Sequence, residues 1–447
     1  MRVLTSRFEG LGCDDYIKDA VTVFPTPLDD LSTLDAGVAA EALISALKEI
    51  FLPNKFVVDF IKEMVGRSVL YCSEMYSTEE SYLRGIYDPR DTEVFPICLT
   101  GLAGVGKTQL VAALRKVLPG PVEIETAHFS GKLETVSHWY ASGRGKSGGR
   151  QLLIDFIGDA LKSAKPYMNS AALLREGRRR AWREAVALAV LDETQHINTG
   201  AGAARVVEII LTLSGIGPSV LFVSNYSLIH KLMARNSEDK QRLLSDPKVM
   251  VPDMPGSEHW YDYLKSCVDV AGSNFAVTAD EIADEVFKST HGIKRLVVHL
   301  FKAAYSEARA AGRKSVTFVD IVNGYRSIGY ASNRMDVEEL QRIAVSGKSG
   351  RGRIDLVCPF ELPSEYSTNV ASYVRREREI AANRIAVTSA LIPAERAALA
   401  DIVEIERQKP TKPKKARRPA AKKASNDQLE DNFNRLTQAW SSKARKA

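Results

Sequence analysis

The stretch FPICLTGLAGVGKTQLVAALRKVL, Phe95 to Leu118, decides the fold. It opens with a short apolar run and closes with a helix-prone segment, and between them Gly101 to Thr108 satisfies the pattern G-x-x-x-x-G-K-[ST]. A strand, a glycine-rich loop and a helix in this order form the context in which the pattern holds phosphate. The glycines let backbone N–H groups turn toward an anion at a helix N-terminus. The sequence therefore predicts a phosphate-binding P-loop.

Two residues of this loop have side chains suited to a nucleoside triphosphate. Lys107 is expected to reach the β and γ phosphates, and Thr108 to hold Mg²⁺. A glycine-rich turn without a ligand is the alternative interpretation. We assign the contacts of ATP to Gly101, Ala103, Gly104, Val105, Gly106, Lys107, Thr108 and Gln109.

Two other segments imitate such loops. GRGKSG, Gly143 to Gly148, resembles a dinucleotide loop, and GKSGRGR, Gly347 to Arg353, resembles part of a P-loop. Neither follows an apolar strand, so we interpret both as flexible basic loops.

Further β-rich runs follow the P-loop, with helical patterns between them. They are VEIETAHF (122–129), AVALAVL (185–191), SVLFVSN (219–225) and, more weakly, KVMVPD (248–253). Nearly continuous apolar strands that alternate with helices are typical of a parallel sheet covered on both faces. The fold class is therefore predicted to be α/β, with a parallel central sheet flanked by helices.

The remaining segments have mostly helical patterns. Residues 1 to about 35 look irregular, helical periodicity runs through 36–50 and 53–76, and after about Pro255 the chain is helical to about residue 345. We divide it into an N-terminal helical region (1–80), a nucleotide-binding α/β core (81–256), a helical lid (257–345), a helical extension (346–406), and a basic disordered arm with a terminal helix (407–447).

An acidic pair, Asp192 and Glu193, follows the apolar run AVALAVL. Phosphoryl transfer depends on positioning and charge stabilisation, so we expect Asp192 to bind Mg²⁺ through water and Glu193 to polarise the attacking water. A solvent-exposed helix cap is the alternative interpretation. The strand SVLFVSN ends in Asn225, which we expect to orient the same water.

Three arginines are candidates for phosphate contact, because a guanidinium recognises phosphate in a bidentate manner. Arg295 precedes the apolar helix LVVHLFKAAY of the lid, and we expect it to reach bound phosphate when the lid closes. For an arginine supplied to a neighbouring subunit, Arg242 is the first candidate and Arg235 the second.

The order of strand, P-loop, helical insertion, Asp-Glu pair, polar residue and Gly-x-x-Arg resembles the AAA+ class. Within that class, LDETQHIN (Leu191 to Asn198) resembles the DE-x-QH signature of transposition ATPases of the TnsC and TniB type. The resemblance spans roughly residues 40 to 330 and is strongest at the two nucleotide motifs. Ser224-Asn225 departs from the Gly-Thr that relatives often have there.

This resemblance implies an ATPase with ATP and Mg²⁺ as cofactors, which forms homo-oligomeric rings or helical filaments on duplex DNA. It further implies a link between a target-selector protein and a transposase, with assembly in the ATP state and disassembly on hydrolysis. By position, Lys107, Thr108, Asp192, Glu193, Asn225 and Arg295 would keep the roles given above. The rivals are another AAA+ DNA machine (a helicase or clamp loader), a nucleotide-gated signalling switch and a non-enzymatic DNA-packaging protein.

The positive charge of the chain is concentrated near its end. Nine of its 61 Lys and Arg residues lie between Arg407 and Lys423, where there is no acid, and the other 52 face 55 acidic residues. A basic run without large apolar residues is expected to be a disordered arm. It would bind DNA by neutralising phosphates; RNA, an acidic protein or solubility are alternative roles.

Two smaller segments also suggest contacts with other molecules. RRRAWRE, Arg178 to Glu184, is a second basic cluster, which we interpret either as a DNA contact or as a solvated helix face packed by Trp182. The stretch LEDNFNRLTQAW, Leu429 to Trp440, has apolar residues at helical spacing, and either docks a partner or caps the folded body.

The remaining composition indicates a cellular setting. Apolar runs such as 185–191 are too short to cross a membrane, and the first residues have no apolar signal segment. The five cysteines are scattered and odd in number, which indicates neither a disulfide framework nor a metal motif. We therefore expect a cytoplasmic protein without a membrane partner.

Overall fold

The computed structural model describes residues 2–90, 94–145, 149–157, 169–197, 202–350, 352–392, 394–395 and 398. The predicted basic arm and terminal helix lie outside these residues, as does most of the predicted extension beyond residue 392. The chain divides after Arg378 into two units. The second unit contains the end of one long helix, α17 (Ser364–Ala390).

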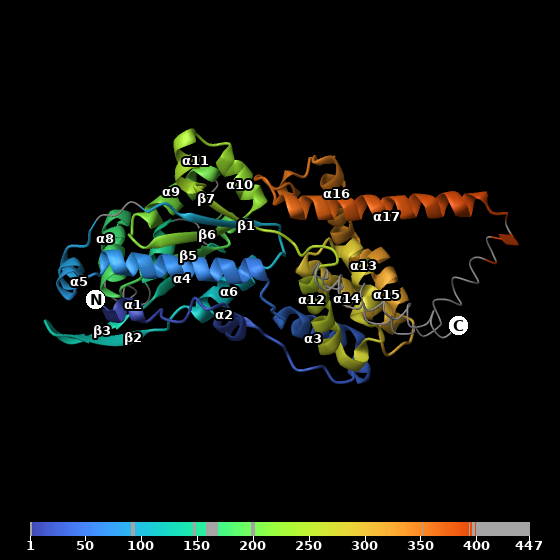
Figure 1. Cartoon of the computed structure of the whole chain (residues 1–447), viewed down its shortest axis with the longest axis horizontal. Helices are drawn as coiled ribbons and strands as arrows, with labels where there is room; N and C mark the ends of the chain where they lie inside the picture. The colour runs from blue at the N-terminus through green and yellow to red at the C-terminus, as the bar shows by residue number, and fades with distance from the viewer. Residues whose placement is uncertain are drawn as a thin grey trace, which may run out of the picture. The chain divides into compact units, whose positions relative to one another are not determined.

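Five parallel strands form the central sheet in the order β4-β5-β6-β1-β7 (Figure 1). Their bounds are His138–Ser142 (β4), Leu188–Asp192 (β5), Ser219–Asn225 (β6), Ile97–Gly101 (β1) and Asp246–Met250 (β7). Gly101 at the end of β1 pairs with Asn225 at the end of β6. The start of the P-loop and the predicted polar residue are therefore neighbours at one edge of the sheet.

Helices cover both faces of this sheet. Successive side chains of a strand point to opposite faces, so each strand contributes to two core clusters. Leu188 and Val190 of β5 pack into one core cluster, whereas Ala189 and Leu191 pack into another. The first cluster includes residues of α1 (Arg2–Ser6), α2 (Asp14–Val21), α4 (Lys55–Met75) and α6 (Lys107–Val117). The second includes residues of α7 (Gly149–Ile157), α8 (Ser170–Arg183), α9 (Ala203–Ser214), α10 (Tyr226–Met233) and α11 (Ser237–Leu243). This is an α/β fold with a parallel central sheet flanked by helices, and the predicted fold class is confirmed.

The strand predictions were wrong at one place. VEIETAHF does not join the parallel sheet: β2 (Val122–Thr126) pairs with β3 (Phe129–Thr135) in a separate antiparallel hairpin. Ile124 and Leu133 are buried while most of their neighbours in these strands are exposed, as in a strand that covers a core with one face only. The remaining strand of the parallel sheet is β4, which was not predicted, because its sequence HWYAS lies at the sheet edge and is not a continuous apolar run.

The start of the chain, predicted to be irregular, contains two short helices. Leu4 of α1 and Ile17 of α2 are fully buried, with Phe8 and Val21 nearly so, in the same cluster as α4 and α6. Helices of five and eight residues are unstable alone. Burial against the core therefore stabilises them, and sequence propensity does not reveal that burial.

The helical lid follows β7. It consists of α12 (Glu258–Ala271), α13 (Ala279–Thr290), α14 (Lys294–Ala310), α15 (Phe318–Arg326) and α16 (Ala331–Ser346). An N-terminal helix, α3 (Ala36–Glu49), shares the core of the lid. So do Tyr366, Val370 and Tyr373 at the start of α17. Within the described residues, no helix is both long and apolar enough to cross a bilayer.

The loop GKSGRGR after α16 was interpreted as flexible, but the structure holds its described residues, 347–350 and 352–353, in place. Glu339, which is 1% exposed, accepts hydrogen bonds from the Ser349 hydroxyl (2.6 Å) and the Gly350 amide (2.8 Å). Arg353 pairs with Asp336 at 2.8 Å. This loop is therefore anchored to the lid at several points.

Candidate nucleotide site

The P-loop connects β1 to α6, which begins at Lys107. Gly104 has a φ of +85° and Gly106 a φ of +115°, a backbone region that favours glycine. A Cβ at Gly104 would also lie 2.8 Å from the Cβ of Arg295. The amide of Arg295, at the start of α14, donates to the Gly104 carbonyl at 3.2 Å. The lid thus contacts the loop at the predicted arginine.

Lys107 is 8% exposed and points back into the loop. Its Nζ donates to the carbonyls of Gly101 and Leu102, each at 2.8 Å. Burial, and then the positive charge of Arg295, lower the pKa of Lys107 to about 7, while Asp192 acts in the opposite direction. The protein supplies too little negative charge near this ammonium to hold the pKa of Lys107 at its usual value. A polyanion such as a triphosphate fits that deficit.

Asp192 ends β5 and is 1% exposed. Its Oδ1 accepts from the Glu193 amide at 2.7 Å, whereas no described group makes a hydrogen bond to its Oδ2. Burial raises the pKa of Asp192, an effect that the Glu193 amide and the nearby Thr108 hydroxyl partly offset. A buried carboxylate oxygen without a donor, beside a threonine hydroxyl, fits a hard cation.

Glu193 begins the turn Thr194–His196 with a φ of +52°. Its Oε1 accepts from Arg144 Nη2 at 2.7 Å, and its Oε2 from the Ser142 hydroxyl at 3.4 Å. Both partners come from the end of β4, the strand that was not predicted. The start of GRGKSG, interpreted as a flexible basic loop, is therefore held at the acidic pair by Arg144, and residues 146–148 lie outside the described chain.

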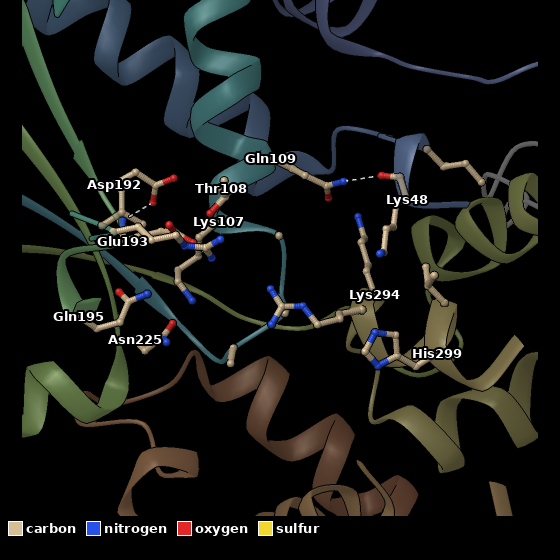
Figure 2. A pocket seen from close by; sticks show the side chains of 18 of the residues that line it. Lys48, Lys107, Thr108, Gln109, Asp192, Glu193, Gln195, Asn225, Lys294 and His299 are labelled. Atoms are coloured by element: carbon tan, nitrogen blue, oxygen red, sulfur yellow. Dashed lines mark hydrogen bonds and ion pairs between the residues drawn. The ribbon is translucent and has the colours of Figure 1, made fainter. Parts of the chain in front are cut away.

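A cavity of about 480 Å³ gathers these groups (Figure 2). Its volume is within the roughly 300–1,000 Å³ of ligand pockets. Of the predicted site residues, it is lined by Ala103, Gly104, Gly106, Lys107, Thr108, Gln109, Asp192, Glu193, Asn225 and Arg295. Gln195, His196 and Arg144 line it too and were not assigned a role from the sequence.

Four predicted residues do not line this cavity. Gly101 contributes only its carbonyl, to Lys107, and Val105 is buried in the core beneath the loop. Arg242 lies on α11 and pairs with Glu238 at 3.3 Å. Arg235 likewise pairs with Asp239 at 3.1 Å. The role of either arginine in a neighbouring subunit stays a prediction.

The far end of the cavity was not predicted. Lys48, Lys294 and His299 lie there, away from the acidic pair (Figure 2). They are accompanied by the apolar or aromatic residues Leu47, Ile50, Tyr263 and Val298. These residues come from α3, the segment after it, α12 and α14. Since no local pattern joins such distant segments, only the fold brings them together.

One buried carboxylate orders this end of the site. Asp253, in the link from β7 to the lid, is 7% exposed. It lies 3.8 Å from Lys294 Nζ and 3.6 Å from His259 Nε2, and accepts from Asn54 Nδ2 at 3.4 Å. The link is thereby tied to both the lid and the N-terminal helices.

The P-loop between β1 and α6 lies where a strand of the parallel sheet ends, and it defines the class as a P-loop protein, here with a helical lid bonded to the loop. No family model matches the chain, and no curated protein sequence matches it either. Among solved structures, it is similar to the Aeropyrum pernix ORC2 protein in ADPNP-ADP complexes, with 14% identity, 61% of this chain and 72% of that chain covered, and a TM-score of 0.39. It is also similar to Drosophila ORC bound to DNA (15% identity, 85% and 86% covered, TM-score 0.39).

A third similar structure is the Thermotoga maritima RuvB Holliday junction branch migration motor (12% identity, 62% and 75% covered, TM-score 0.33).

Proposed function

We propose that this chain binds ATP with Mg²⁺ and hydrolyses it. One observation carries the proposal: the cavity joins Lys107 and Thr108 of the P-loop to the carboxylates of Asp192 and Glu193. The first two come from α6 and the other two from the end of β5, so the fold brings separate motifs to one site. A glycine-rich turn without a ligand would not need this convergence.

Each residue has a task that its surroundings suit. The amides of the P-loop and the Lys107 ammonium would bind the β and γ phosphates, and Arg295 would add a guanidinium from the lid. Thr108 and Asp192 would hold Mg²⁺, which when bound neutralises charge developing on the phosphates. Glu193 would accept the proton of the attacking water, and Asn225 would orient that water.

The opposite end of the cavity fits the nucleoside. The apolar or aromatic side chains at this end, which offer surface for the flat face of a base, are those of Leu47, Ile50, Tyr263 and Val298.

Across the described part of the chain, no three His, Cys, Asp or Glu side chains are grouped as in a metal site. A magnesium ion at Asp192 would therefore complete its shell with phosphate oxygens and water, as this ion usually does.

We further propose that the ATPase regulates DNA transposition. The support is the resemblance of LDETQHIN to the DE-x-QH signature, together with the basic run at Arg407 to Lys423. In this proposal the chain assembles on duplex DNA when ATP is bound, links a target selector to a transposase, and disassembles on hydrolysis. Arg242, on the exposed helix α11, would act on the nucleotide of an adjacent subunit.

The test is ATP binding and turnover by the purified chain with three variants. Lys107→Ala is expected to abolish binding, Glu193→Gln to retain binding but lower turnover about 100-fold or more, and the exposed control Lys116→Ala to match the wild type. A Lys107→Ala variant that binds and hydrolyses ATP as the wild type does would refute the nucleotide site.

A second experiment addresses DNA. In the presence of a non-hydrolysable ATP analogue, the wild type is expected to form DNA-coating oligomers and neither to unwind duplexes nor to open clamps. Turnover indifferent to duplex DNA, without salt-dependent retention of DNA, would favour a signalling switch instead.

A further inference from the structure

The basic segment Arg178 to Glu184 forms the end of helix α8 (Ser170–Arg183) and its C-cap, and the outer face of this helix is an arginine stripe. Arg175, Arg179 and Arg183 are all exposed and follow one another at intervals of four residues. Residues at this spacing lie on one side of a helix. Ala171 completes this exposed row, so no acidic side chain interrupts it.

The stripe has no partner among the residues that the structure describes. No hydrogen bond or ion pair is made there by the side chains of Arg175, Arg179 or Arg183. The two other arginines of the segment are engaged: Arg178 donates to the Gly215 carbonyl, and Arg180 pairs with Glu184. Helix α8 therefore carries two arginines that bond to other parts of the protein. Its other three arginines have side chains with no partner among the described residues.

The opposite face fixes this helix in place. Leu173, Ala181 and Trp182 are buried, and the Trp182 indole donates to the Tyr82 carbonyl at 2.8 Å. Tyr82 belongs to α5 (Glu79–Tyr87) and its hydroxyl donates to the Arg183 carbonyl at 2.5 Å. The interpretation of Trp182 as a packing residue is confirmed. The arginines next to it therefore project from a rigid helix and not from a mobile loop.

We propose that this stripe binds the phosphates of one strand of duplex DNA, an inference that rests on the proposed DNA-binding function. Eight residues of helix span about 12 Å. One strand of a duplex presents its phosphates in regular succession, so the three arginines can each contact one phosphate. Arginine is the side chain best suited to bidentate contact with them. The proposed contacts are made to phosphates, which carry no sequence information directly, so the proposed binding is independent of sequence.

Salt dependence of binding tests the proposal quantitatively. Each phosphate contact contributes about −0.9 to the slope of log K against log salt. In the full chain, Arg175→Gln with Arg179→Gln and Arg183→Gln is expected to make the slope shallower by about 2 to 3 and to weaken binding about 100-fold near 0.1 M salt. Replacing the same three arginines by lysine is expected to retain most of the slope.

The matched control removes the same charge elsewhere. Lys55→Gln, Lys62→Gln and Lys302→Gln together neutralise three lysines, the first two exposed and the third half-buried, which pair with Asp59, Asp14 and Glu41. This variant is expected to keep the wild-type slope. Far-UV circular dichroism and melting temperature establish that each variant is folded.

Three outcomes would overturn the inference. A wild-type slope in the α8 glutamine variant would refute the stripe while leaving DNA binding by the chain intact. Polyglutamate serves as a model of an acidic protein. If the α8 glutamine variant binds duplex DNA as the wild type does but loses the wild type's binding to polyglutamate, the stripe is assigned to an acidic protein. If the wild type itself shows no salt-dependent retention of duplex DNA, the proposed DNA function fails and the inference fails with it.

Discussion

Binding of ATP should draw a proton onto Lys107, and pH is the perturbation that reveals it. Burial and the charge of Arg295 bring the pKa of this lysine to about 7, against its usual 10.5. The free site therefore holds a largely neutral amine above neutral pH. A bound triphosphate places negative charge beside the amine, which favours the ammonium and raises its pKa.

The magnitude follows from this pKa. With a value of about 7, the free amine is about 50% neutral near pH 7 and about 90% neutral near pH 8. Binding should therefore take up about 0.5 proton near pH 7 and about 0.9 near pH 8. Isothermal titration calorimetry in buffers of different ionisation enthalpy measures this uptake directly. An uptake that stays near zero at both pH values would refute the buried, charge-poor environment assigned to Lys107.

Stability of the nucleotide-free chain provides an independent check. The folded pKa lies below the unfolded one, so between about pH 7 and 10.5 the unfolded state binds more protons. The destabilisation is complete below about pH 7 and disappears as the pH rises toward 10.5, with a slope of at most about 1.4 kcal/mol per pH unit. Lys107→Met, which cannot titrate, should lack this contribution to the slope in urea unfolding.

Three further substitutions test other contacts. Arg144→Ala frees Glu193 and should raise basal turnover only about two- to fivefold, because a pair whose arginine is 71% exposed contributes at most about 1 kcal/mol; a large loss would instead place Arg144 on the phosphates. Gly104→Ala forces a Cβ toward Arg295 at positive φ and should weaken ATP binding about 5- to 30-fold, whereas Gly120→Ala, in open space, should not. Trp182→Ala should lower the free energy of unfolding by about 3–5 kcal/mol in urea titrations.

The parts of the site that could be predicted are those whose residues are adjacent in the sequence. Lys107 and Thr108 follow a glycine pattern, and Asp192 with Glu193 follows an apolar strand. Such patterns predict both the local element and its chemistry. The residues they indicate in the P-loop, at the acidic pair and at Asn225 converge because parallel strands end at the same edge of the sheet.

The missed residues depend on which strands are neighbours. Arg144 reaches Glu193 only because β4 lies next to β5, and the polar and aromatic sequence of β4 did not indicate a strand. VEIETAHF was assigned to the sheet because a β-rich run does not show whether its partner is parallel or antiparallel. Lys48 and Lys294, which are far apart in the chain, share a cavity only after the lid has folded over α3.

The bond between Arg295 and Gly104 joins main chain to main chain. An Arg295→Ala substitution removes the charge of the side chain but leaves this backbone bond in place. Its effect on ATP binding would therefore report the contribution of the side chain and not that of the bond. A change in the curvature of the glycine loop would displace the acceptor of this bond, whatever side chain occupies position 295. The lid can therefore sense the shape of the loop as well as the charge of its ligand, and a single amide-to-ester replacement at that position would separate the two.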